Sequence, residues 1–245
     1  RVEEAVRKLD YRPNYMAKGL MERKTYSVGI LVPSLSNHYF TELLESIEEL
    51  LRPEELMVLF CSTKDDPERE KEHLGNLLAR SVDGVIVVDG TSENSRSGYF
   101  QSVAARVPLG IVNGDTEGIP LHTVLFDQAY GTRLALEHLF GLGHRNIAFV
   151  RGRYGFSYEL RERAFRDFFR LEAEELPQEN IICIPYGNTE EAISMTEKLF
   201  SGVFDRTNSP TAILASNDLM ATGVVHAAEE KGLRVPQDIS VIGHD

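Results

Sequence analysis

The chain has 245 residues, a formal net charge of −12, two cysteines and no tryptophan. Its length suits about two domains of roughly 100–150 residues each, and a composition of 42% apolar and 26% charged residues excludes a disordered chain. No apolar run approaches the roughly 18 residues that a membrane helix needs. Two cysteines cannot build a disulfide framework, and because Cys61 and Cys183 lie in apolar runs, we expect buried, reduced thiols.

The charge is distributed unevenly along the chain. Residues 1–24 hold seven basic and four acidic side chains, a net charge of +3, whereas the remaining residues carry −15. A basic arm on an acidic body is typical of a contact with nucleic acid or with a membrane surface, although a solvated arm has the same composition. The overall negative charge therefore does not exclude DNA as a partner.

The first residues predict two short helices. Apolar residues recur at helical spacing over residues 2–9, which we interpret as the end of a helix, and Pro13 stops it because the residue before a proline avoids the helical region. Asn14 is a good N-cap for a second helix over residues 15–21. Gly19 destabilises that helix by about 1 kcal/mol relative to alanine, so we expect it to be marginal unless something binds it.

From Tyr26 onward, short β-branched apolar runs alternate with stretches of helical pattern. The runs are nearly continuous, as strands buried on both faces of a parallel sheet should be. This alternation predicts an α/β fold with parallel sheets. The expected strands are 27–32, 56–61, 84–88, 109–112, 123–126, 146–150, 181–184, 211–215 and 239–243. The expected helices are 38–51, 67–80, 97–106, 128–140, 157–172, 189–201 and 218–231.

Two halves of this region resemble each other. Residues 27–32 and the following helix resemble residues 146–151 and their helix, and residues 82–89 resemble residues 210–218 at a similar offset. We therefore expect two lobes of one architecture with the crossover near Asp127. Any two doubly wound sheets share part of this pattern, so the duplication is an interpretation.

Polar side chains follow the expected strands at the ends where open parallel sheets bind ligands. Two lobes with these ends facing each other would form a polar cleft for a small molecule, although such side chains also cap helices. Asp218 is the strongest candidate. Ser216 or Asn217 can cap the next helix, which leaves the Asp218 carboxylate free to bind sugar hydroxyls or a base N–H. Tyr39 and Phe40 can stack on a sugar or a base, and both also suit a core. The strand-end residues are Ser34, Asn37, Asp89, Asn113, Asp115, Asp127, Asn188, Asn217, Asp218 and Asp245.

Signatures of enzymes and of metal sites are absent from the sequence. It contains no phosphate-binding GxxxxGK(S/T) loop and no GxSxG nucleophile elbow, and the glycines at 141–143 follow a helix instead of a strand. No two of the seven histidines have HxxxH spacing, and there is no CxxC. We therefore expect a protein that is not an enzyme and has no cofactor and no metal.

Taken together, these residues resemble the lactose-repressor (LacI/GalR) family of bacterial transcription regulators. The resemblance covers essentially the whole chain, and the segments that carry it are weak alone and strong jointly. They are RPN leading to AKGL over 12–20, VGILVP over 28–33 with SNHYF over 36–40, VDGVI over 82–86, LFGLGHRNIAF over 139–149, PTAI with NDLMATG over 210–223, and GLRVPQDISVIG over 232–243.

The resemblance implies a two-lobed core of the type I periplasmic-binding-protein-like fold, each lobe a doubly wound parallel sheet, preceded by a DNA-binding headpiece. Its implied parts are the end of the helix-turn-helix headpiece over 1–13, a hinge helix and linker over 14–25, an N-terminal lobe over 26–127 and a C-terminal lobe over 128–245. On this basis we expect a fragment that lacks most of the headpiece and the final strands. The implied partners are operator DNA, a small-molecule effector and a second copy of the chain. The resemblance also implies a cytoplasmic protein that does not contact a membrane.

Position by position, the resemblance implies DNA-contact roles for Ala17, Lys18 and Leu20. Leu20 matches a leucine that pries open a base step in the minor groove, Ala17 lets two hinge helices approach, and Lys18 matches a groove or phosphate contact. Gly19 and Met21 stand where relatives commonly carry serine and a basic residue, which weakens the expected hinge contact.

The resemblance also implies an effector pocket. Ser157 is the loosest of its matches because the loop over 153–160 aligns poorly, and Ala164 and Gln128 replace residues that are usual in the family. The matched pocket positions are Tyr39, Phe40, Ser157, Arg161, Asn188 and Asp218.

The implied function is a transcriptional regulator, a repressor, whose operator affinity is controlled by a sugar or related metabolite bound between the lobes. The effector would shift a population between two lobe arrangements that order or melt the hinge helices. A secreted sugar-binding protein of the same fold is the alternative, although it has no reason to keep a basic front and a hinge pattern. A glycosidase-like enzyme with paired carboxylates is a third possibility that no spacing specifies.

Overall fold

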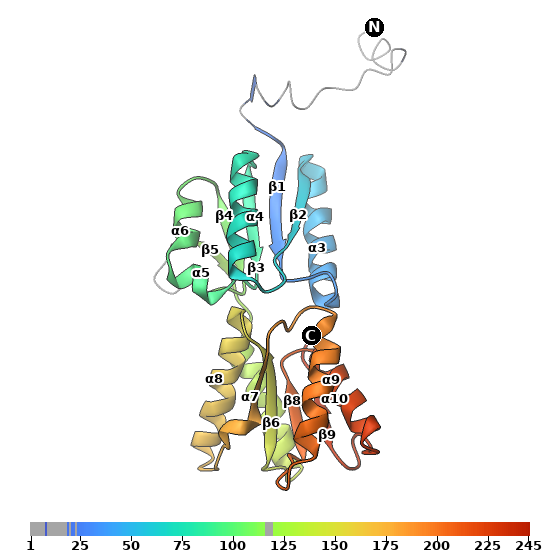
Figure 1. The fold of residues 1–245 in the computed structure, drawn as a ribbon. Helices are drawn as coiled ribbons and strands as arrows, with labels where there is room; N and C mark the ends of the chain where they lie inside the picture. The colour runs from blue at the N-terminus through green and yellow to red at the C-terminus, as the bar shows by residue number, and fades with distance from the viewer. Residues whose placement is uncertain (1–7, 9–18, 20, 23, 116–119) are drawn as a thin grey trace.

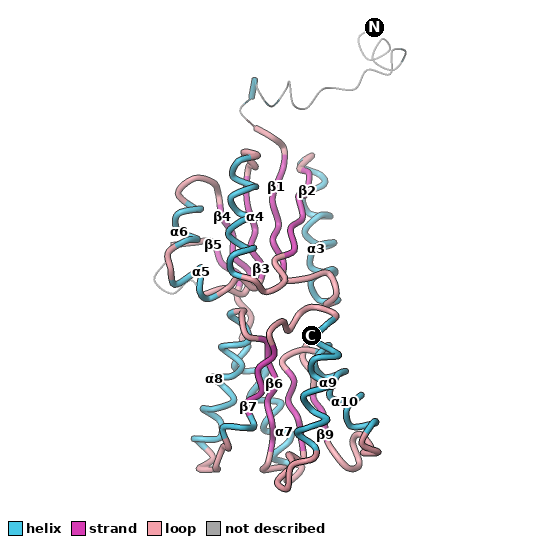
Figure 2. The backbone as a smooth tube through the Cα atoms, in the orientation of Figure 1, coloured by secondary structure: helices cyan, strands magenta, loops and turns pink. Residues whose placement is uncertain are grey.

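The computed structural model describes residues 8, 19, 21, 22, 24–115 and 120–245. The elements from Ser27 onward form two stacked α/β lobes (Figures 1 and 2). The first lobe contains a five-stranded sheet and the second a four-stranded sheet, and all paired strands are parallel. The predicted α/β fold, with a parallel sheet in each of two lobes, is therefore confirmed. The DNA-contact predictions for Ala17, Lys18 and Leu20 lie outside the described residues. No helix in the described ranges is long and apolar enough to cross a membrane.

The first lobe packs helices on both faces of its sheet, whose strand order is β2-β1-β3-β4-β5. Alternate residues of β1 face opposite sides, so that Ile30 packs toward α3 while Leu31 packs toward α4 and α6. This arrangement buries β1 completely, as its continuous apolar run predicts. The elements are β1 (Ser27–Val32), α3 (His38–Leu51), η1 (Arg52–Glu54), β2 (Met57–Ser62), α4 (Pro67–Ala79), β3 (Gly84–Val88), α5 (Ser92–Arg96), α6 (Tyr99–Ala104), β4 (Leu109–Val112) and β5 (His122–Val124).

The second lobe repeats the first. Its strand order, β7-β6-β8-β9, matches β2-β1-β3-β4 of the first lobe position by position, in agreement with the expected duplication. Helices α7 and α8 cover one face of this sheet, and α9 and α10 cover the other. The elements are α7 (Gln128–Gly141), β6 (Ile147–Gly152), α8 (Phe156–Leu171), η2 (Gln178–Asn180), β7 (Ile181–Ile184), α9 (Glu191–Phe204), β8 (Ala212–Ala215), α10 (Asp218–Glu230) and β9 (Ser240–Ile242).

The edge strands correct two expectations. Strands β2 and β7 lie at sheet edges, so their apolar runs are not buried on both faces. In β7 the residues on either side of Cys183 are buried while Cys183 itself is exposed, and Cys61 in β2 is half-buried. The expectation of two buried thiols was therefore wrong, because helices cover only one face of β7.

Helix α6 (Tyr99–Ala104) confirms the helix expected over 97–106, and a short helix that was not expected, α5 (Ser92–Arg96), precedes it. Gly98 separates α5 from α6 and adopts a left-handed φ of 78°. Glycine reaches this conformation without the steric penalty of a side chain, so it can end one helix and begin the next. The break places α5 at the junction between the lobes (Figure 1).

A buried carboxylate holds the loop that precedes α5. Glu70 of α4 accepts hydrogen bonds from the Thr91 N–H at 3.1 Å, from the Thr91 hydroxyl at 2.7 Å and from Asn94 Nδ2 at 2.7 Å. Burial raises the pKa of Glu70 to about 7, against the opposing effect of these bonds. Glu70 thus anchors the segment that carries Asp89 and Arg96 toward the second lobe.

The raised pKa of Glu70 predicts a pH dependence of stability. The folded state binds this proton more tightly than the unfolded state, so the associated stabilisation is present at lower pH and is lost as pH rises through about 7. The free energy of unfolding should therefore rise between pH 8 and pH 6.5, and Glu70→Gln should reduce that slope. Urea unfolding at several pH values measures it, and an unchanged slope in Glu70→Gln would contradict the assignment.

Helices α9 and α10 pack closely at Gly223. A Cβ at this position would collide with the Ile193 carbonyl oxygen and would lie 2.8 Å from Thr196 Cβ. By contrast, Gly202 of α9 is exposed, and a Cβ there would have no heavy atom within 4 Å. Gly223 therefore allows the two helices to approach closely, whereas no atom of the described residues packs against the Gly202 position.

We predict that Gly223→Ala lowers the free energy of unfolding by about 1–3 kcal/mol, because backbone atoms must move to admit the methyl group. The matched change Gly202→Ala should raise it by up to about 1 kcal/mol, because alanine is the better helix former. Urea unfolding of both variants checks the contrast, and equal effects would refute the close packing.

Candidate functional site

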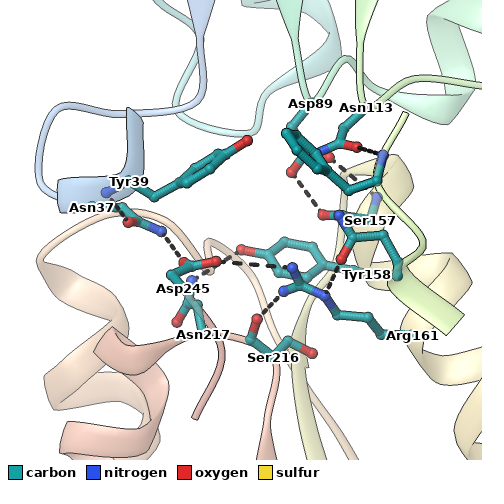
Figure 3. A network of polar contacts seen from close by, with 12 residues as sticks. Asn37, Tyr39, Asp89, Asn113, Ser157, Tyr158, Arg161, Ser216, Asn217 and Asp245 are labelled. Carbon is teal, nitrogen blue, oxygen red and sulfur yellow. Dashed lines mark hydrogen bonds and ion pairs between the residues drawn. The ribbon is translucent and has the colours of Figure 1, made fainter. Parts of the chain in front are cut away.

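A cavity of about 390 Å³ lies between the two lobes. Its walls are the segments that follow strands of both sheets, so the carboxyl ends of the two sheets meet here, as expected for a ligand site in this class of fold. Figure 3 shows several of its side chains converging from the two lobes. The lining residues are Tyr39, Phe40, Asp89, Asn113 and Phe126 from the first lobe side, and Gln128, Ser157, Tyr158, Arg161, Asn188, Asn217, His244 and Asp245 from the second.

An aromatic group forms one wall of the cavity. The Tyr39 ring contacts Phe40 edge-on at 5.2 Å and Phe126 at 6.4 Å between ring centroids. The Tyr39 hydroxyl is buried and has no hydrogen-bond partner among the described residues. Burial, with the nearby carboxylates of Asp89 and Asp245, raises the pKa of Tyr39 to about 12. The hydroxyl therefore stays protonated and keeps an unused donor beside the cavity.

Arg161 of α8 is a buried cation at the floor of the cavity. Its Nε donates to Gln128 Oε1 at 2.9 Å, and its Nη1 donates to the Ser216 carbonyl oxygen. Its Nη2 lies 3.8 Å from Asp245 Oδ1. These partners orient the guanidinium, and its charge partly compensates the carboxylates around the cavity.

Asp89 joins the two lobes by capping a helix of the opposite lobe. It follows β3 in the first lobe and accepts hydrogen bonds from the Ser157 N–H at 3.1 Å and the Ser157 hydroxyl at 2.8 Å. Helix α8 has no cap of its own, because Gly155 stands at its N-cap position. A carboxylate at a helix N-terminus is favoured by the free N–H groups and by the helix dipole. Burial nevertheless raises the pKa of Asp89.

Three asparagines form a chain of amide contacts across the junction. Asn217 caps α10 by accepting from the Met220 N–H at 3.0 Å, and its Nδ2 donates to Asn188 Oδ1 at 3.1 Å. Asn37 Nδ2 donates to the same Asn188 oxygen at 3.3 Å and to Asp245 Oδ2 at 2.7 Å. Burial raises the pKa of Asp245 to about 6. The amides thus connect the first turn of α3 to two segments of the second lobe.

The structure brings together five of the six matched pocket positions. Tyr39, Phe40, Ser157, Arg161 and Asn188 all line the cavity. Their role in binding an effector remains a prediction.

Asp218 is the exception. It is exposed in the first turn of α10 and is not among the lining residues. Its carboxylate packs against Gly243, where a Cβ would collide with it. The inference that Asn217 caps α10 and leaves Asp218 uncommitted to the cap agrees with the hydrogen bonds, but the freed carboxylate lies beside the cavity and not in its wall.

Other strand-end candidates serve different purposes. Asp89, Asn113 and Asp245 line the cavity, as does Asn217. The side chains of Asn37 and Asp127 cap α3 and α7. The strand-end pattern therefore identifies the correct edge of each sheet but does not separate lining residues from caps.

Several residues at the junction carried no signal in the sequence. Phe126 is the last residue of the expected strand 123–126, and His244 directly follows the expected strand 239–243. A search of strand ends that included aromatic and histidine side chains would have found both. Tyr158 is adjacent to the predicted Ser157. Asp65 directly precedes Asp66, the N-cap of α4, so its position in the sequence suggests only a local role. Its side chain instead accepts a hydrogen bond from the second lobe. Among the described residues, no group of three or more possible ligands could hold a metal ion.

Comparisons with known proteins agree with this architecture. The family model of the periplasmic binding protein-like domain matches residues 136–245. The regulator DegA of Bacillus subtilis is 32% identical over 249 residues, covering 100% of this chain and 72% of the relative. Catabolite control protein A of Staphylococcus xylosus is 31% identical over 245 residues, covering 99% and 71%.

Solved structures give the same result. The lac repressor dimer bound to operator and the anti-inducer ONPF has a TM-score of 0.80 at 27% identity, covering 100% of this chain and 72% of that one. A LacI family regulator from Lactobacillus casei with bound glucose has a TM-score of 0.76 at 26% identity, covering 89% and 80%. Because relatives aligned over the full length of this chain are transcription regulators with the same two-lobed fold, the chain belongs to the lactose-repressor (LacI/GalR) family of transcription regulators.

Proposed function

We propose that this protein is a DNA-binding transcriptional repressor whose affinity for operator DNA is controlled by a neutral sugar bound between its lobes. The observation that carries the proposal is the cavity of about 390 Å³ whose walls come from both lobes. A molecule bound there contacts both lobes at once, so it discriminates between their possible arrangements. A ligand shifts such an equilibrium only by its differential affinity for the two states, typically about 1–3 kcal/mol.

The chemistry of the lining favours a neutral, polyhydroxylated ring. The Tyr39 and Phe126 rings offer apolar faces on which a sugar can stack, and amides and hydroxyls surround them. Among the described lining residues, Arg161 is the single cation and lies near the carboxylates of Asp89 and Asp245, so the lining disfavours a phosphosugar. The Lactobacillus casei regulator, whose structures contain glucose and sucrose, supports this class of ligand.

The effector residues in this proposal include those matched from the sequence. Tyr39, Phe40, Ser157, Arg161 and Asn188 would contact the sugar directly. Asp218 would act from outside the lining, since it packs against Gly243 next to His244 and Asp245.

Communication with DNA would run through contacts that cross the junction. Besides the Asp89–Ser157 cap, Arg96 of α5 pairs with Glu159 of α8 at 2.5 Å, which links the first lobe to the same helix. A change in lobe arrangement would alter these contacts. In this proposal two copies of the chain dimerise, and the segment that contains Ala17, Lys18 and Leu20 contacts the operator.

We predict that Tyr39→Phe affects the stability of the free protein and its affinity for sugar in different ways. Without ligand, the variant should be as stable as the wild type or more stable, because the buried Tyr39 hydroxyl has no hydrogen-bond partner in the described part of the chain. Sugar affinity should fall about 2–13-fold, equivalent to one hydrogen bond of about 0.5–1.5 kcal/mol. Thermal shift and calorimetry with glucose, ribose, sucrose and glucose 6-phosphate would measure both effects.

The matched control is Tyr186→Phe. Tyr186 is partly exposed and does not line the cavity, so its substitution should leave sugar affinity unchanged. Equal losses in the two variants, or binding of only the phosphorylated sugar, would contradict the proposed site chemistry.

For the DNA contact, Leu20→Ala in the full-length protein should weaken operator binding at least tenfold and reduce DNA bending, because the side chain that parts a base step is lost. Sugar affinity should stay unchanged. The exposed Leu142→Ala serves as the control for loss of a leucine elsewhere. Electrophoretic mobility measurements on circularly permuted operators report affinity and bending, and wild-type values for Leu20→Ala would exclude the hinge role.

A further inference from the structure

Asp65 is a buried carboxylate whose hydrogen bonds all cross between the lobes. It lies in the loop between β2 and α4 of the first lobe and is only 2% exposed. Its Oδ2 accepts from the N–H groups of Gly187 and Asn188, both at 3.1 Å, and its Oδ1 accepts from Asn188 Nδ2 at 3.0 Å. Among the described residues, its side chain has no hydrogen bond within its own lobe.

The loop backbone is held in the conformation that directs this side chain outward. The N–H groups of Thr63 and Lys64 donate to the carbonyls of Val32 and Pro33, which anchors the loop to the end of β1. Lys64 and Asp65 then adopt left-handed φ values of 54° and 59° in succession. Such non-glycine conformations are strained and persist only where surrounding contacts enforce them. The contact with the second lobe is therefore part of what holds the loop in place.

The same contact determines the orientation of an amide at the cavity. Asn188 lines the cavity, and its Oδ1 accepts from Asn37 and Asn217 while its Nδ2 donates to Asp65. A flipped Asn188 amide would point its NH₂ group at two other donors and its oxygen at a carboxylate. Asp65 thus selects one orientation of this side chain.

The Gly187 backbone leaves the segment little freedom to shift. A Cβ on Gly187 would collide with the Tyr158 hydroxyl and lie 3.0 Å from Gly152 Cα, so the segment is wedged against α8 and β6. Its N–H and that of Asn188 point to Asp65. Without the carboxylate, two buried donors would lose their partner, which is costly in a dry interior.

Holding the loop with the buried Asp65 carboxylate has a desolvation cost. Burial raises its pKa to about 7 although Asn188 and Gly187 donate to it, and the neighbouring Asp89 carboxylate adds to the rise. No cation is paired with its carboxylate in the described part of the chain. A group that only filled space here would be better apolar, since an unpaired buried charge is unfavourable.

We propose that Asp65 is a positioning residue of the effector site, which clamps the segment between β7 and α9 from the opposite lobe and orients Asn188 in the cavity. This inference rests on the proposed function, because it takes the cavity to be the effector site. The bonds of Asp65 exist only while the lobes are in contact, so Asp65 couples the lobe arrangement to the shape of the site.

A pair of adjacent substitutions tests the clamp. Asp65→Asn places an NH₂ group among three donors, whereas Asp66→Asn removes the same charge from the same loop but keeps the cap of α4, because asparagine caps as well as aspartate. With the tightest-binding neutral sugar among glucose, ribose and sucrose, Asp65→Asn should weaken binding at least tenfold. Asp66→Asn should change it less than twofold.

A double-mutant cycle separates positioning from a general structural role. In an Asn188→Ala background the amide that Asp65 orients is gone, so adding Asp65→Asn should weaken binding further by only about threefold or less. A tenfold loss in both backgrounds would show that Asp65 acts independently of Asn188 and would overturn the proposal.

A readout without ligand keeps the clamp separate from the sugar proposal. Amide hydrogen exchange of Gly187 and Asn188 should accelerate at least tenfold in Asp65→Asn and stay at the wild-type rate in Asp66→Asn. If exchange responds this way but no sugar binds the wild type, the sugar function fails and the clamp is upheld. If sugar binds the wild type and Asp65→Asn changes neither affinity nor exchange, the clamp is overturned and the sugar function stands.

Discussion

The structure depends on first-lobe carboxylates that satisfy backbone N–H groups of the second lobe. Asp89 takes the place of the missing cap of α8, and Asp65 binds two consecutive N–H groups before α9. These donors belong to segments that would otherwise leave buried polar groups without partners, which folded proteins avoid. The two lobes are therefore incomplete without each other at their contact, although each has its own sheet and core.

This arrangement has an energetic consequence. The pKa values of Asp65, Asp89 and Asp245 are all raised by burial, so the contact between the lobes carries a desolvation cost that hydrogen bonds and Arg161 offset in part. A ligand shifts such a contact by its differential affinity for the possible lobe arrangements. The polar junction therefore suits the switching that the proposed function requires.

The sequence already contained the elements and their order. Nearly continuous apolar runs identified the strands, and the expected and observed bounds of β1, β3, β4 and β7 coincide. The cap of α10 was also predicted to within one residue, as Ser216 or Asn217, since a cap and its helix are neighbours in the chain. The misses were the burial of the edge strands and the short helix α5. Burial depends on what packs against a strand, and five residues are too few to show a helical period.

What the sequence alone determined was the α/β fold, its two lobes, the edge of each sheet that carries the polar residues, and the family. Only the tertiary structure decided which polar residues meet across the junction, because partners such as Asp89 with Ser157 and Asp65 with Asn188 are 68 and 123 positions apart. It also placed Asp218 beside the cavity instead of in its wall. Asp65 contacts the second lobe, whereas its neighbour Asp66 caps α4. Local hydrogen bonds and apolar periodicity are encoded over a few residues, whereas the orientation of one lobe on the other depends on the packing of the whole chain.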